Sequence, residues 1–177
     1  PAIYLSVANG DLDYSVVYYQ PGHQAFFENA GGTRKLAGVG ALTPDGLQGY
    51  QIDKKTADQY NITNLEQLKD PKIAKLFDSD GDGLANLVGC NAGWACELII
   101  NQHLEAYGLK DTVEQDTGQY TPLLANSLAR YKQGKPVIFY AYNPHWINAT
   151  LKLNQDVVWL EVPFTSLPKS IGSNALE

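Results

Sequence analysis

An alternation of short apolar runs with amphipathic segments constrains the fold most. PVIFY (136–140) and VVWLEV (157–162) are rich in β-branched and aromatic residues, which predicts buried strands. Residues 93–107 and 121–132 carry apolar side chains at helical spacing, and in the first of these helices Leu98, Ile99, Leu104 and Tyr107 form the predicted apolar face. Helices alternating with buried strands predict an α/β protein with a mainly parallel sheet.

The rest of the chain is predicted to form shorter helices and strands. A capping box, Asn64 with Gln67, marks the start of one helical turn. Helices are expected at 2–9, 22–30, 54–60, 65–69 and 71–77, strands at 14–18 and 85–88, and extended segments at 36–42 and 47–52 around a turn at 43–46.

Composition and charge exclude several classes of function. The net charge is −6 and the basic residues are scattered, so no basic stripe exists to neutralise nucleic-acid phosphates. No apolar run approaches the ~20 residues of a spanning helix. The chain shows no nucleophile elbow, phosphate-binding loop or zinc-protease motif. We therefore expect a binding protein rather than an enzyme.

The run DSDGDGLAN (78–86) is half of a calcium loop. Asp78, Asp80, Asp82 and Asn86 stand at positions 1, 3, 5 and 9 of the D-x-D-x-D-G pattern, but Gly89 occupies the place of the bidentate acid. A structural Ca²⁺ and an ordinary surface loop rich in Asx turns both fit this run.

The two cysteines, Cys90 and Cys96, do not match zinc or redox spacing. In an exported protein they most simply form a disulfide, while a thiol nucleophile paired with a histidine stays open as an alternative. Trp94 stands between them in the first turn of the 93–107 helix, where the amides of Trp94, Ala95 and Cys96 lack helical partners. Such amides bind anions and an indole face binds cations, although Trp94 also fits as a core residue of an amphipathic helix.

Two further aromatic clusters, 18–19 and 140–146, follow predicted strands, where ligands of α/β proteins gather. Together with Trp94 they would furnish a cage for a bulky cation.

Four runs carry a family resemblance: residues 51–78, the pattern GDG-A-L-GCN-GW-CE, RYKQGKPV and DVVWLEVPF. They resemble glycine betaine/proline betaine-binding proteins of the ProX type, the periplasmic receptors of an osmoprotectant ABC importer. The similarity runs from about Leu5 to Pro168. It implies a type II periplasmic-binding-protein fold with the ligand between two lobes. By this resemblance, residues 1–47 are part of the first lobe with one wall of the ligand site, 48–168 the second lobe, and 169–177 a tail.

The resemblance also implies roles for single residues. The family's aromatic box around the quaternary ammonium maps onto Tyr19, Trp94 and Tyr142, its carboxylate contacts onto His23 and the amides of Ala95 and Cys96, and its disulfide onto Cys90 and Cys96. Tyr19 and Tyr142 replace tryptophans of the family, and Ala95 replaces a glycine. The expected function is delivery of a betaine-like osmoprotectant to a membrane permease from a periplasmic or extracytoplasmic location. The alternative is a calcium-binding extracytoplasmic interaction module.

Overall fold

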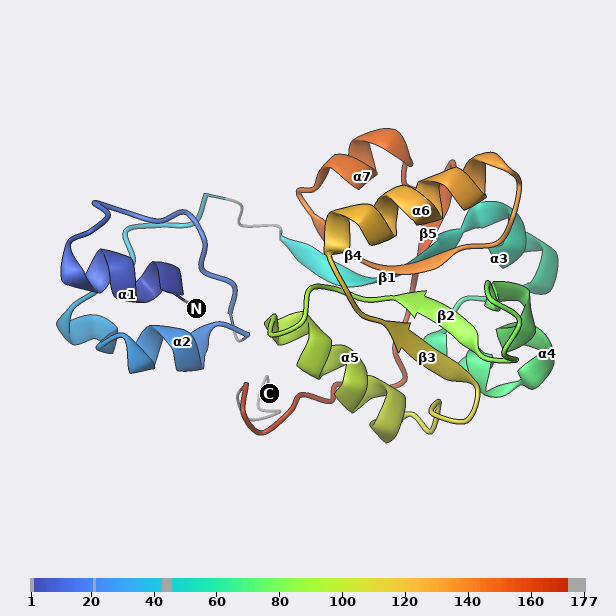
Figure 1. Cartoon of the computed structure of the whole chain (residues 1–177), viewed down its shortest axis with the longest axis horizontal. Coiled ribbons are helices and arrows are strands. Elements are labelled where there is room, and N and C mark those ends of the chain that lie inside the picture. The colour runs from blue at the N-terminus through green and yellow to red at the C-terminus, as the bar shows by residue number, and fades with distance from the viewer. Residues whose placement is uncertain (1, 21, 43–45, 172–177) are drawn as a thin grey trace. The chain divides into compact units, whose positions relative to one another are not determined.

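The chain forms two compact units in a computed structural model that describes residues 2–20, 22–42 and 46–171. The smaller unit combines Pro1–Pro44 with Leu167–Glu177, and the larger unit is Asp45–Ser166 (Figure 1). The lobe boundaries expected at residues 47 and 168 stay predictions.

The smaller unit is built on α1 (Ala2–Asn9), α2 (Gln24–Asn29) and the 3₁₀ turn η1 (Gly32–Arg34). Tyr4 of α1 packs edge-on against Tyr18, and Tyr18 stacks on Phe27 of α2 at 5.0 Å between ring centroids. The prediction of a strand at 14–18 is wrong. The described part of this unit contains no strand, so these residues have none to pair with. Residues 36–42 lie outside any strand as well, and most of the predicted turn at 43–46 lies outside the described residues.

The larger unit confirms most of the expected elements. Asp53 caps α3 by accepting the Thr56 amide at 2.8 Å, and the Asn64–Gln67 capping box is present. In chain order the elements are β1 (Leu47–Asp53), α3 (Lys54–Tyr60), η2 (Leu65–Lys69), α4 (Pro71–Ala74), η3 (Lys75–Phe77), β2 (Ala85–Val88), α5 (Ala95–Ala106), β3 (Val113–Asp116), α6 (Tyr120–Lys132), β4 (Ile138–Asn143), α7 (Trp146–Thr150) and β5 (Val157–Leu160).

These strands form one mixed sheet in the order β3-β2-β4-β1-β5. β2 pairs parallel with β3 and β4, whereas β1 pairs antiparallel with β4 and β5. The prediction of a mainly parallel sheet is therefore wrong for half of the pairings. A continuous apolar run indicates that a strand is buried on both faces. An internal strand of a covered sheet is buried in this way whether its neighbours are parallel or antiparallel, so the run does not report strand direction. α5 and α6 cover opposite faces of the sheet (Figure 1).

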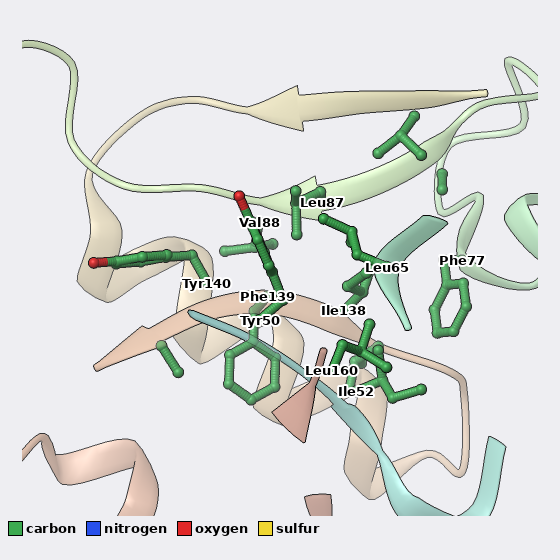
Figure 2. Packing of buried hydrophobic residues seen from close by; sticks show 14 of the residues in the cluster. Tyr50, Ile52, Leu65, Phe77, Leu87, Val88, Ile138, Phe139, Tyr140 and Leu160 are labelled. Carbon is green, nitrogen blue, oxygen red and sulfur yellow. The ribbon is translucent and has the colours of Figure 1, made fainter. Parts of the chain in front are cut away.

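The core lies between the sheet and its helices. Figure 2 shows Ile52 of β1, Leu87 of β2 and Phe139 of β4 within this packing, and each is fully buried. Helix α5 adds Ile100 and Leu104. Leu98 is 45% exposed, so its predicted place on the apolar face is wrong. Two residues beyond the buried Cys96, it is turned about 200° round the helix.

In the part of the chain that the structure describes, no helix has the length and apolar character needed to cross a membrane.

Candidate functional site

Trp94 is the N-cap residue of α5, with extended backbone (φ −79°, ψ 153°), rather than a residue of its first turn. Its side chain is 40% exposed, which argues against the reading of Trp94 as a core residue. Its amide donates to the Asn91 carbonyl at 3.1 Å, so the prediction that this amide is free is wrong. The tight turn before the helix, with Gly93 at φ +81°, consumes that donor and leaves the indole at the surface.

The next two amides, those of Ala95 and Cys96, meet the prediction. Neither donates a hydrogen bond within the described residues, whereas the amide of Gly93 donates to the Glu97 carboxylate at 2.6 Å. Both lie at the start of a 12-residue helix, whose dipole places partial positive charge there. This end of α5 therefore offers two donors to an anion next to an exposed indole.

A disulfide between Cys90 and Cys96 closes this turn, with the two Cα atoms 6.3 Å apart. Cys90 follows β2 and is fully buried, and Cys96 lies in the first turn of α5. The predicted pairing is confirmed, and among the described residues no cysteine is free to act as a nucleophile. The bond ties the start of α5 to the segment that follows β2, an internal strand of the sheet.

Tyr120, at the start of α6, connects Trp94 to Tyr142 on β4. Its ring centroid lies 6.1 Å from Trp94 and 5.8 Å from Tyr142, on which it stacks at 24°. His145 lies 4.6 Å from Tyr142 and 5.3 Å from Tyr120. We call Trp94, Tyr120, Tyr142 and His145 the aromatic group. His145 belongs to the aromatic cluster predicted at 140–146, whereas no role was predicted for Tyr120, whose only sign in the sequence is an aromatic residue just before a predicted helix.

Burial disfavours the charged form of two members of the aromatic group, Tyr120 and His145. Burial raises the pKa of Tyr120 far above its usual range, with smaller contributions from Tyr142 and Tyr140, and its hydroxyl donates to the Tyr140 carbonyl at 2.8 Å. Burial also lowers the pKa of His145, whose Nδ1 is buried without a partner in the described structure. Neutral rings present their π faces to a cation without a competing positive charge.

Tyr19 and His23 lie together in the smaller unit, with ring centroids 5.3 Å apart and edge to face. Tyr19 is 46% exposed. The Tyr4 hydroxyl donates to the Val17 carbonyl at 2.8 Å and lies 2.6 Å from His23 Nδ1. A hydroxyl has one proton, so Nδ1 of His23 must carry the hydrogen of this second contact. Nε2 of the neutral ring is then an acceptor. Burial lowers the pKa of His23.

The acidic loop brings the carboxylates of Asp78, Asp80 and Asp82 within 4.8 Å of one another. Each already accepts backbone amides of the loop, and the Asp78 carboxylate accepts two, from Gly81 and Gly83. The fourth predicted ligand, Asn86, also accepts a backbone amide of the loop. Its Oδ1 accepts the Ser79 amide at 2.6 Å.

The amide nitrogen of Asn86 donates to Glu114 and Asp116 on β3, at 2.7 and 3.2 Å. Burial raises the pKa of both carboxyl groups, and Asp80 and Asp82 raise them further. The negative charge of the loop thus extends onto the sheet edge.

A cavity of about 70 Å³ lies apart from the aromatic group, beneath α6. Its polar lining comes from Ser79, Asn86, Asp116, Asn126, Ser127 and Arg130. It includes none of the predicted betaine ligands. The assignment of betaine ligands around the exposed Trp94 stays a prediction.

Comparison with known proteins matches residues 1–174 to the family described as the substrate binding domain of the ABC-type glycine betaine transport system. The chain is 53% identical over 165 residues to the glycine betaine-binding periplasmic protein OusX of Dickeya dadantii, and 52% identical to the glycine betaine/proline betaine-binding periplasmic protein of Escherichia coli. Each match covers 93% of this chain and 50% of the relative. The chain thus spans about half the length of the curated relatives it matches.

Among solved structures, the fold is similar to the glycine betaine, L-proline-binding protein ProX of Borrelia burgdorferi, with a TM-score of 0.68 at 19% identity. That match covers 97% of this chain and 57% of the other. The expected fold class, a partial two-lobed periplasmic-binding-protein fold, is confirmed. The chain belongs to the family of substrate-binding domains of ABC-type glycine betaine transport systems.

Proposed function

We propose that this chain binds glycine betaine, proline betaine or a related quaternary-ammonium osmoprotectant and delivers it to the permease of an ABC importer. The observation that carries the proposal is the start of α5, where an exposed indole adjoins two amides that have no hydrogen-bond partner among the described residues. A betaine carries a trimethylammonium group and a carboxylate on one short skeleton. Indole and free amides are the groups that these two charges require.

Each unit carries an aromatic ring that suits the ammonium group and a polar group that suits the carboxylate. The larger unit has the rings of Trp94 and Tyr142 with the amides of Ala95 and Cys96, and the smaller unit has Tyr19 with His23. The proposal assigns both sets to one ligand. Trp94, Tyr142 and Tyr19 would hold the ammonium at about 1–2 kcal/mol each once water is excluded. His23 and the two amides would hold the carboxylate.

The protein performs no chemistry on its ligand in this proposal. Its relatives are binding proteins by name, and binding followed by release to the permease is all that delivery needs. We place the protein in the periplasm or another extracytoplasmic compartment, as its relatives' names say of them. The Cys90–Cys96 disulfide supports this placement, since disulfides persist in oxidising compartments.

Nuclear magnetic resonance of the 177-residue chain tests the proposal, because it detects weak as well as tight binding. Glycine betaine, proline betaine, choline and dimethylsulfoniopropionate are titrated while the Trp94 indole and the Ala95 and Cys96 amides are followed. We expect the two betaines to shift all three signals and choline, which lacks a carboxylate, to leave the amides in place. Unmoved signals with every ligand would refute the proposal.

Two pairs of variants assign the contacts. Trp94→Ala should weaken betaine binding about tenfold or more, whereas Tyr60→Ala, which removes an aromatic residue of similar exposure at the end of α3, should not. In the smaller unit Tyr19→Ala should weaken binding and Tyr14→Ala, at a more exposed tyrosine, should not. Equal effects within a pair would remove the named ring from the site.

A calcium-binding interaction module is the second candidate, and the clustered carboxylates of Asp78, Asp80 and Asp82 favour a structural Ca²⁺. It predicts a melting temperature that rises with CaCl₂ and is unaffected by betaines. The betaine proposal predicts that betaines raise the melting temperature even in the presence of a chelator. Differential scanning calorimetry with each addition separates the two.

A further inference from the structure

Asn91 joins the starts of two helices. Its backbone carbonyl accepts the amide of Trp94 at 3.1 Å, and its side-chain Oδ1 accepts the amide of Tyr120 at 2.6 Å. Tyr120 is the first residue of α6, and the N-cap residue Gln119 provides no side-chain cap. The side chain of Asn91 therefore supplies the missing cap of α6 from the turn that precedes α5. One residue fixes the backbone at both Trp94 and Tyr120.

Tyr120 is held at its other end too. Its hydroxyl donates to the carbonyl of Tyr140 on β4, two residues before Tyr142. The Tyr120 ring contacts both Trp94 and Tyr142. Only 3% of Tyr120 is exposed, so its own ring offers a ligand almost no surface. Its contacts with the two rings thus set the position of each relative to the other.

We infer that Asn91 and Tyr120 are positioning residues that set the spacing of the Trp94 and Tyr142 rings, and with it the size of ammonium group that the site accepts. This inference rests on the proposed function for the ligand, while the positioning itself is a property of the free protein. A ring already held in place loses little freedom on binding. A freed Trp94 must be immobilised by the ligand, which costs about fivefold in affinity.

The positioning is measured first without ligand. Trp146→Phe and Trp159→Phe leave Trp94 as the only tryptophan, and its fluorescence anisotropy decay reports the local motion of the indole. In this background Asn91→Ala should increase that motion. Asn91→Asp keeps an acceptor oxygen and should preserve the unmodified anisotropy. Asn64→Ala is the matched control, because Asn64 Oδ1 likewise accepts a helix-start amide, that of Glu66 at 3.0 Å, far from the aromatic group.

The same variants are then titrated with glycine betaine and proline betaine. We expect Asn91→Ala to bind glycine betaine about fivefold more weakly and to change the ratio of the two affinities, with Asn91→Asp restoring both. Tyr120→Phe loses only the bond to the Tyr140 carbonyl and should show a smaller change in the same direction. If Asn91→Ala does not fold, Asn91→Gln, which displaces the acceptor by one methylene, replaces it.

The outcomes separate the two hypotheses. Unchanged Trp94 motion in Asn91→Ala, or an equal change in Asn64→Ala, would overturn the positioning role. Increased motion together with no betaine binding by the unmodified chain would overturn the proposed function and leave the positioning role standing. Increased motion with an unchanged affinity ratio would overturn the claim that these residues set the size of the ammonium group.

Discussion

Replacing Asp53 by alanine should destabilise the larger unit far more than an ordinary cap mutation does. The carboxylate is 4% exposed and accepts two buried amides, from Thr56 at 2.8 Å and from Val137 at 3.0 Å. The first bond caps α3, and the second ties that cap to the chain just before β4. Loss of the cap costs about 1 kcal/mol. The buried Val137 amide left without an acceptor costs about 2 kcal/mol more.

Asp70 provides the matched comparison. It caps α4 through the Lys72 amide at 2.8 Å but is exposed, so water replaces the carboxylate when it is removed. We therefore expect the free energy of unfolding to fall by about 3 kcal/mol in Asp53→Ala and by about 1 kcal/mol or less in Asp70→Ala. Asp53→Asn retains one acceptor and should lie between them. Urea unfolding followed by far-ultraviolet circular dichroism measures all three. Equal losses in the two alanine variants would refute the argument from burial.

Three further predictions concern the disulfide and two histidines. Reduction of the Cys90–Cys96 disulfide should lower the free energy of unfolding, measured with urea, by about 2 kcal/mol. The double variant Cys90→Ala/Cys96→Ala should not respond to the reductant. A urea midpoint that stays unchanged on reduction of the unmodified chain would contradict this estimate from loop entropy. Because Nε2 of neutral His23 is an acceptor, a betaine carboxylate can bind there only to the protonated ring, and its binding raises the pKa of His23. Calorimetry in buffers of different ionisation heat should therefore show proton uptake on binding, and the affinity should fall as pH rises. His23→Gln should abolish both effects. Burial lowers the pKa of His103, whose Nδ1 lies 2.7 Å from the Tyr50 hydroxyl. The stability that neutral His103 provides is therefore complete above the unfolded pKa of about 6.5 and is lost as pH falls below it. The urea midpoint should show this dependence on pH, and His103→Gln should flatten it.

Local patterns in the sequence predict the elements that depend on local interactions. The capping box at Asn64 and the helices α3, α5 and α6 follow from caps and apolar spacing within one segment. The strand β3 escaped notice because its residues, VEQD, show neither alternation nor an apolar run. Glu114 and Asp116 project toward Asn86 across the sheet edge, and no pattern within β3 encodes that partner.

The candidate site divides in the same way. The position of Trp94 at the start of α5 and the pairing of the cysteines follow from a single run of residues. The role of Tyr120 does not, because it depends on a hydrogen bond to Asn91 and on stacking with Tyr142, both far away in the sequence. The antiparallel placement of β1 escaped prediction too, since strand direction is decided by the path of the chain and not by side-chain composition.

That placement of β1 governs when the larger unit can fold. β1 is the first strand of this unit along the chain, yet its two neighbours in the sheet are the last two strands of the unit, and Tyr50 pairs with Leu160. Until β5 joins the sheet, one edge of β1 has no partner, and closing so long a loop is slow. The sheet of the larger unit is therefore completed by contacts between the two ends of that unit, and its folding depends on bringing these ends together.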